Sequence, residues 1–242
     1  MAAGQSHRFS RNPARAVRHG LLAAVACALL SACTGLVVYS TADTQVGVID
    51  PGLLQANRLA FITPSTITGK EEDKQALALA FAGVLSERRP DLQLVSLAET
   101  LSAINAAGLS ERYRDMYHDY RDTGIFRSDI LREVGKVIHS RFLIQLKLAQ
   151  FEQDSAGRWS MLGLRLVETK RARMRLFFQI WDSTTGRIVW ESLHELSVAN
   201  DTYTERAVTF RDVARRVAND VADLLPGRPP SPPFPEEPEE GE

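Results

Sequence analysis

Carboxylate and imidazole side chains recur on one face of a helix predicted over residues 111–122. Asp115, His118, Asp119 and Asp122 are spaced i, i+3, i+4 and i+7, which brings all four onto the same helical face. Oxygen and imidazole ligands at this spacing could hold a divalent cation. Arginines of the same helix could instead pair with these carboxylates on a solvated face, and we favour that interpretation. We therefore predict no metal site.

The sequence does not indicate hydrolytic or nucleotide chemistry. It contains no glycine-rich phosphate loop, no G-x-S-x-G elbow and no H-E-x-x-H motif. The enzymatic alternative is a site assembled from distant residues such as Asp182, His194 and Glu195. We predict that the protein is not an enzyme and that it uses no cofactor.

A second stripe on the same helix consists of aromatic and thioether side chains. Tyr113, Met116, Tyr117 and Tyr120 recur at i, i+3, i+4 and i+7. Tyr and Met are common in the centres of protein interfaces, so this stripe is a candidate partner-docking surface. The alternative, which we favour, is that the stripe covers a β-sheet.

Overall composition excludes several classes of protein. The 242 residues are 44% hydrophobic and 24% charged, as in ordinary globular proteins. With 29 Lys and Arg against 30 Asp and Glu, the formal net charge of −1 gives no reason to expect nucleic acid as a partner. Two cysteines cannot form a disulfide framework.

The first 32 residues have the order of a secretory signal peptide. Four arginines and no acidic residue precede an apolar run from Leu21 to Leu30, and small residues follow it. The run is shorter than the roughly 20 residues that a membrane-spanning helix needs. We expect residues 1–32 to be removed from the mature protein.

The end of this segment, Leu30-Ser31-Ala32-Cys33, resembles the lipobox of bacterial lipoproteins. The resemblance implies cleavage between Ala32 and Cys33, and covalent diacylglycerol and acyl chains on Cys33. Such chains hold a protein on a membrane surface without threading it through. Thr34 in place of Asp favours the outer membrane in the enterobacterial sorting pattern. The alternative is a soluble periplasmic protein with an ordinary signal and a chance cysteine.

Composition divides the mature chain into three parts. Residues 33–57, which begin with the lipidated cysteine, are expected to form a tether, and residues 58–225 one α/β domain. Residues 226–242 hold seven of the eleven prolines and five glutamates. Such a segment cannot bury enough apolar surface to fold, so we expect a disordered tail.

The first half of the domain alternates between strand and helix patterns. A Ser96-x-x-Glu99 capping box should begin the second helix, and Ser110 and Ser128 could cap two more. The expected elements are a strand at Arg58–Thr63, a helix at Lys70–Arg89, a strand at Leu92–Val95, and helices at 96–108, 111–122 and 129–139.

The second half changes to a period of two, which predicts a β-meander. We expect strands from Phe142 to about 153, about 158–170, about 174–181 and 187–198, with turns at 154–157 and 182–186, followed by a helix at about 205–225. The basic run at 170–175 could contact anionic lipid or cell-wall polymer, but we favour the interpretation that it protects an exposed sheet edge. The pattern β-α-β-α-α-α, meander, helix predicts a single mixed sheet with helices packed against it, a fold of the α/β (α+β) class.

This order of elements resembles the periplasmic lipoprotein domains of the CsgG-like, TolB N-terminal and LpoB-like family. The segments that carry the resemblance are Leu59–Ile62, Leu92–Ser96, Val134–Ile144, and Phe178–Trp190 with its Asp-x-x-x-Gly turn. The resemblance implies a domain that binds partners or assembles and that brings no catalytic residues. Curli-channel relatives insert hairpins into a membrane, but the hairpin expected here is charged and lacks a continuous apolar face.

We therefore expect a membrane-anchored periplasmic lipoprotein of the cell envelope that acts as a partner-binding accessory or assembly factor. The expected partners are the membrane, through the lipid, and an envelope protein. The main alternative is an oligomeric ring or secretion-channel subunit, in which copies of the chain associate with one another.

Overall fold

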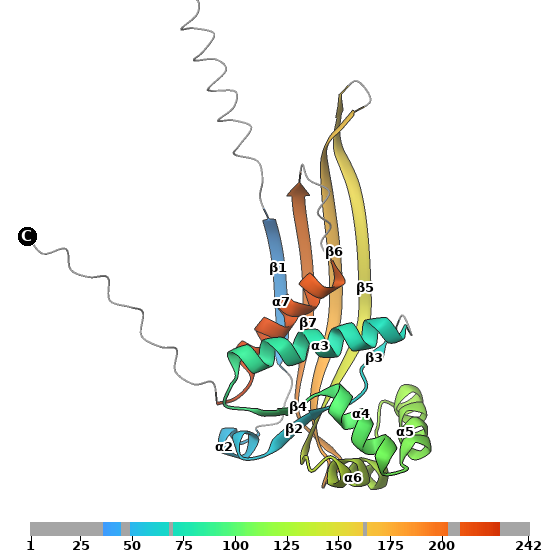
Figure 1. Cartoon of the computed structure of the whole chain (residues 1–242). Helices are drawn as coiled ribbons and strands as arrows, with labels where there is room; N and C mark the ends of the chain where they lie inside the picture. Colours follow the sequence, from blue (N-terminus) through green and yellow to red (C-terminus); the bar gives the residue numbers. More distant parts are fainter. Residues whose placement is uncertain (1–35, 45–48, 68–69, 162–163, 203–208, 228–242) are drawn as a thin grey trace, which may run out of the picture.

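Three long strands built from the period-two half of the chain dominate the computed structural model (Figure 1). They are β5 (Phe142–Met161), β6 (Leu164–Asp182) and β7 (Arg187–Thr202), joined as an antiparallel meander. The structure describes residues 36–44, 49–67, 70–161, 164–202 and 209–227.

One mixed seven-stranded sheet organises the domain, in the order β1-β7-β6-β5-β2-β4 with β3 also pairing β5. The meander strands and β1 are antiparallel, whereas β2, β3 and β4 join the sheet by parallel pairing. The remaining strands are β1 (Leu36–Thr44), β2 (Arg58–Phe61), β3 (Ser65–Thr66) and β4 (Gln93–Val95). The predicted fold class and element order are confirmed.

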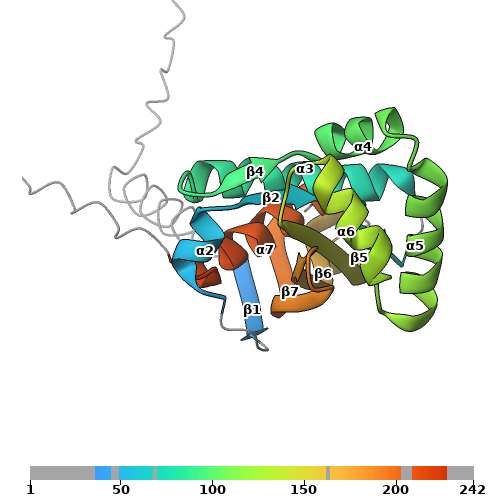
Figure 2. The same ribbon diagram turned by 90° about the horizontal axis from the view of Figure 1, so that it is seen from below.

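Helices cover both faces of this sheet (Figure 2). On one face α3 and α7 share a core with β5, β6 and β7, and on the other α4, α5 and α6 enclose a second core. Leu77, Phe81, Val84 and Leu85 are buried as their helical spacing predicts. The helices are α2 (Pro51–Gln55), α3 (Glu71–Arg88), α4 (Leu97–Ala106), α5 (Ser110–Thr123), α6 (Ser128–Val137) and α7 (Phe210–Leu224).

Helix starts follow the sequence signals in part. The predicted capping box of α4 is present, since Ser96 Oγ accepts from the Glu99 amide and the Glu99 carboxylate accepts from the Ser96 amide. The caps predicted at Ser110 and Ser128 are wrong, because both residues lie inside their helices.

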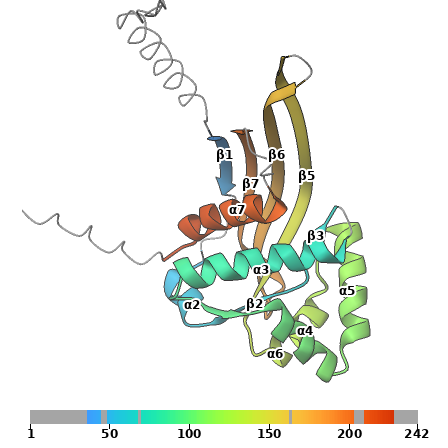
Figure 3. The same ribbon diagram turned by 45° about the horizontal axis from the view of Figure 1, so that its top comes forward.

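The turn predicted at residues 154–157 is also wrong. These residues continue β5, with Asp154 opposite Arg171 and Gly157 opposite Glu168. The pairing becomes irregular after Gly157, so this turn-forming sequence produces a β-bulge within the strand and not a chain reversal. The meander therefore has three long strands, β5, β6 and β7, where four were expected. These strands carry the sheet past the helices (Figures 1 and 3).

Part of the segment assigned to a tether is folded. Strand β1 pairs along its whole length with β7, from Leu36 opposite Asn200 to Thr44 opposite Ser192, and α2 follows. The predicted signal peptide, Ala32, Cys33 and residues 228–242 of the tail lie outside the described residues. Within the described part of the chain, no helix is long and apolar enough to cross a membrane.

Candidate functional site

The aromatic stripe of α5 faces the sheet. Tyr113, Met116 and Tyr120 are buried, and Tyr120 stacks on Phe126 with ring centroids 4.1 Å apart. Tyr117 is half-buried between them. Burial raises the pKa of each of the three tyrosines, which therefore stay protonated.

Hydrogen bonds fix this stripe to the strands beneath it. The Tyr117 hydroxyl donates to Gln145 Oε1 and the Tyr120 hydroxyl to Gln179 Oε1, each at 3.1 Å. The Tyr113 hydroxyl accepts from the Thr63 amide at 2.9 Å. These side chains are used inside the fold, which agrees with the interpretation that Tyr113, Met116, Tyr117 and Tyr120 cover the sheet.

The acidic stripe of α5 lies on the outer side of the same helix. Arg114 contacts Asp115 at 3.3 Å and Arg121 contacts Asp122 at 3.4 Å, all with well-exposed side chains. Among the described residues, His, Cys, Asp and Glu form no group of three or more that could hold a metal ion. The stripe has the arrangement of a solvated charged face.

The three residues of the enzymatic alternative are not brought together. His194 is fully buried, whereas the next residue, Glu195, points to the opposite face of the sheet and pairs with Arg175 at 2.8 Å. Asp182 lies at the far end of β6, where Arg141 Nη2 donates to it at 3.0 Å. This separation removes the basis for a shared catalytic site.

The basic run at 170–175 does not lie on a sheet edge, so that prediction is wrong. β6 pairs with β5 on one side and β7 on the other throughout this run. Its arginines lie opposite acidic residues of neighbouring strands, with Arg173 in register with Glu152. Opposite charges across strands explain the pattern.

The chain enters the sheet only three residues after Cys33. Leu36 is the first residue of β1, and its register places it at the end of the sheet away from α4, α5 and α6 (Figure 1). From this level β5 continues from Ser155 to Met161, which corresponds to about 20 Å of strand. The N-terminal entry and the projecting hairpin thus share one end of the domain.

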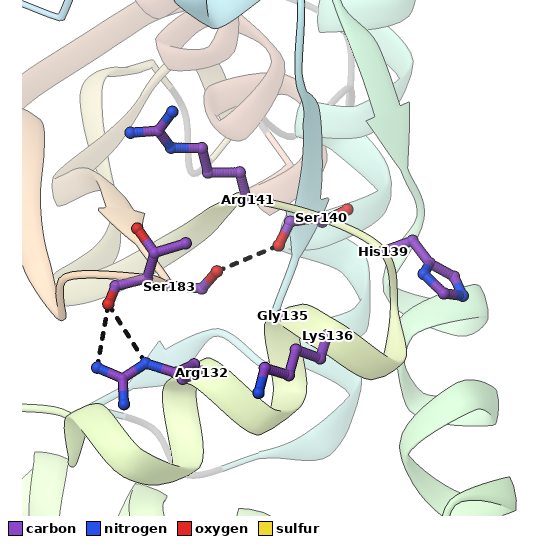
Figure 4. Close-up of a pocket in the computed structure, with 8 residues that line it drawn as sticks. Arg132, Gly135, Lys136, His139, Ser140, Arg141 and Ser183 are labelled. Carbon is purple, nitrogen blue, oxygen red and sulfur yellow. Dashed lines mark hydrogen bonds between the residues drawn. The ribbon is translucent and has the colours of Figure 1, made fainter.

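A pocket of about 390 Å³ lies at the other end, where α6 meets the turn between β6 and β7 (Figure 4). Its lining includes Arg132 and Lys136 of α6, His139 and Arg141 of the following segment, and Thr184 of the turn. Arg132 Nη2 donates to the Thr184 carbonyl at 3.1 Å.

Gly135 allows α6 to approach the turn closely enough to form this pocket. A Cβ at this position would lie 2.3 Å from Ser183 Oγ and 2.9 Å from the Ser140 carbonyl. Sequence reasoning missed the pocket, because Arg132 and Lys136 at i and i+4 were its only local signal. The turn that completes it lies more than 40 residues later in the sequence.

No known family model matches the sequence, and no curated protein matches it. Several solved structures are similar in fold. The PelC dodecamer from Paraburkholderia phytofirmans has 11% identity, with 76% of this chain and 94% of that chain covered and a TM-score of 0.40. Lipoprotein GNA1162 from Neisseria meningitidis has 12% identity, 69% and 99% coverage, and a TM-score of 0.36.

The LpoB C-terminal domain from Salmonella enterica has 13% identity, covering 57% of this chain and 81% of that chain, with a TM-score of 0.31. The predicted resemblance to bacterial lipoprotein domains is therefore present as a distant structural likeness without a family-model match. At these values the likeness concerns the arrangement of the chain and does not bear on function.

Proposed function

We propose that this protein is a lipid-anchored periplasmic lipoprotein of the cell envelope. Its α/β domain binds an envelope protein and performs no catalysis. The lipobox ending at Cys33 supports the anchor. The observation that carries the proposal is the short distance from that cysteine to the fold: Leu36 is already paired in the sheet.

The short connection between Cys33 and β1 restricts how the domain can be oriented relative to the membrane. Three residue steps from Cys33 to Leu36 span at most about 11 Å. A domain held so closely keeps the β1 end of its sheet towards the bilayer and presents α4, α5 and α6 away from it. Confinement also raises the effective concentration of the domain for neighbours within reach. We expect the outer membrane as its location, from Thr34.

The anchor is tested with Cys33→Ser, and Cys27→Ser is the matched control because Cys27 lies in the segment expected to be cleaved. We expect Cys33→Ser to move the protein from the membrane fraction to the periplasmic extract and Cys27→Ser to leave it in the membranes. Density-gradient separation then distinguishes the outer membrane from the inner one. Retention of Cys33→Ser in the outer membrane would overturn the anchor, whereas an uncleaved precursor held by its signal segment would fractionate with the inner membrane.

Partner binding is tested by proximity crosslinking in intact cells, with a photo-crosslinking residue at Ile125. This side chain is 64% exposed, between α5 and α6. The control position is Tyr39 on β1, which is 72% exposed near the proposed anchor. We expect an envelope protein to be captured from Ile125 and not from Tyr39. Capture of no envelope protein above background from either position would contradict the proposal.

A second candidate function is self-assembly, which the sheet edges favour. Within the described part of the chain, β1 pairs with β7 alone and β5 beyond Leu148 pairs with β6 alone. Such edges offer free backbone groups to another strand. Mass photometry of the detergent-extracted protein tests this: a discrete oligomer supports assembly, and a monomer at all concentrations excludes it.

A further inference from the structure

The pocket at the end of α6 concentrates positive charge. Two arginines, one lysine and one histidine line it, and none of the described residues in its lining is acidic. Arg132 and Lys136 stand one helical turn apart on the same side of α6. His139 and Arg141 follow where the chain leaves the helix (Figure 4).

The carboxylate that contacts the lining residues is already engaged. Asp182 is buried and accepts from the Thr184 amide at 2.8 Å, the Thr184 hydroxyl at 2.6 Å and Arg141 at 3.0 Å. Burial acts to raise the pKa of Asp182, but the bonds from Thr184 and Arg141 outweigh it and lower the pKa, so the group is ionised. Its charge offsets that of Arg141 and leaves Arg132 and Lys136 without a carboxylate partner among the described residues.

The guanidinium of Arg132 is held in place by neutral groups. Its Nε and Nη2 both donate to the Thr184 carbonyl, at 3.4 and 3.1 Å, which leaves donors of the other terminal nitrogen for a ligand. Because the carbonyl fixes the group without neutralising it, the positive charge stays available. A fixed guanidinium suits the paired oxygens of a phosphate or carboxylate.

The backbone at the rim reverses direction where α6 ends. His139 has a φ of 51°, and it is the single non-glycine residue with positive φ in the described part of the chain. It is the left-handed residue of a Schellman motif that ends α6, in which the Ser140 amide donates to the Gly135 carbonyl at 2.9 Å and the His139 amide to the Lys136 carbonyl at 3.2 Å. The conformation turns the chain back from α6 into β5, which brings Arg141 to the same pocket as Lys136.

We propose that this pocket binds the oxyanion group, phosphate or carboxylate, of a small ligand. Arg132 and Lys136 supply the uncompensated charge, whereas Arg141 points away from them and is paired with Asp182 (Figure 4). The site is independent of the anchor at Cys33, so its failure and the failure of the proposed function are separate results. In the orientation proposed above, it opens at the end of the domain away from the membrane.

The test is a nuclear magnetic resonance titration of isotopically labelled full-length protein in dodecyl maltoside, which contains neither phosphate nor carboxylate. Inorganic phosphate and succinate are the probes, and sodium chloride at equal ionic strength is the reference. We expect saturable shifts confined to the amides of residues 132–141 and 183–184. Saturation by phosphate alone, by succinate alone or by both tells which oxyanion the site accepts.

The variant Arg132→Gln/Lys136→Gln should weaken binding at least about tenfold, since it removes two charge-assisted hydrogen bonds. Lys136→Gln alone, which breaks no contact that the structure records, should weaken binding less. Arg171→Gln on β6 removes one positive charge at the other end of the sheet, as Lys136→Gln does at the pocket, and should leave binding unchanged. Unchanged melting temperatures establish that the variants are folded.

Three results would overturn the proposal. Shifts that chloride reproduces, or no saturable shifts, would mean that these cations only complement the C-terminal dipole of α6. Equal affinity in Arg132→Gln/Lys136→Gln would place binding elsewhere. Shifts of the same amides on deletion of residues 228–242, with no anion present, would assign the pocket to the glutamate-rich segment of this chain.

Discussion

The hydroxyl of Ser192 lies 2.8 Å from Nε2 of His194, and both side chains are fully buried on the sheet face that α7 covers. No partner is present for His194 Nδ1 among the described residues. Asp220 of α7 is the acidic group that acts on this imidazole, and Ser40 of β1 donates to its carboxylate at 2.7 Å. A neutral imidazole therefore sits where β1, β7 and α7 meet.

This arrangement predicts that acid destabilises the fold. Burial lowers the pKa of His194, and the attraction of Asp220 opposes this only in part. The unfolded chain, with the ordinary value of 6.5, therefore takes up a proton before the folded chain does. Stability is complete above that value and falls as pH drops below it, towards the lower folded pKa.

The measurement is urea denaturation between about pH 8 and about pH 5, the range in which histidine titrates. We expect His194→Gln to remove part of the pH dependence. The exposed His118, replaced by Gln, is the control and should leave the profile unchanged. Identical profiles for the unmodified protein and His194→Gln would contradict the prediction.

Gly135→Ala should destabilise the protein by about 1–3 kcal/mol, the usual range for overpacking. The added methyl group would meet Ser183 Cβ at 2.5 Å and the Ser140 carbonyl at 2.9 Å. Gly83→Ala is the matched control in α3, where an added Cβ meets nothing within 4 Å. That change should stabilise by up to about 1 kcal/mol, through helix propensity. Equal effects in chemical denaturation would refute the steric argument.

Arg89→Met should cost about 3–5 kcal/mol, because it removes a buried guanidinium and leaves its half-buried and buried partners unsatisfied. Arg89 is 1% exposed and donates to Asp91 at 2.8 Å, to the Leu225 carbonyl at 3.0 Å and to the Pro226 carbonyl at 2.8 Å.

The neighbouring Arg88 provides the control for this prediction. Its side chain is 37% exposed and pairs with Asp223 at the surface. Arg88→Met should therefore cost less than about 1 kcal/mol in thermal or urea unfolding. Comparable losses for the two variants would show that burial does not decide the effect.

Tyr120→Phe should destabilise by about 1 kcal/mol, the net value of one hydrogen bond. The loss stays small because Gln179 Oε1 still accepts from Trp181 Nε1 at 3.1 Å. Tyr120→Ala, which also removes the ring stacked on Phe126, should cost about 3–5 kcal/mol. Urea denaturation measures both, and Tyr39→Phe at an exposed position should have no effect. A Tyr120→Ala variant as stable as the unmodified chain would contradict the structural role and favour the interpretation that this residue contacts a partner.

Sequence reasoning succeeded where the determining contacts are local. The capping box at Ser96 and Glu99 and the apolar face of α3 involve residues within two helical turns of one another. It failed where the partner is distant. β1 is a short apolar run that becomes a strand only because β7, more than 140 residues later, pairs with it. Likewise, the composition at Asp154 favours a turn, but cross-strand pairing with β6 prevails.

The same distinction explains the sites. The spacing of Tyr113, Met116 and Tyr120 identified one helical face, and the favoured interpretation, a face covering the sheet, agrees with the burial observed. The basic pocket depends on a helix end and a turn that meet only in the folded chain, and no local motif marks the pair Arg132 and Thr184.

The nine-residue pairing of β1 with β7 has a mechanical consequence. With a lipid on Cys33, any pull between the membrane and a bound partner passes through β1 along the strand direction. Its backbone hydrogen bonds then share the load in shear instead of opening one after another. The domain therefore stays at a fixed distance from the membrane until the force is large enough to separate β1 from β7.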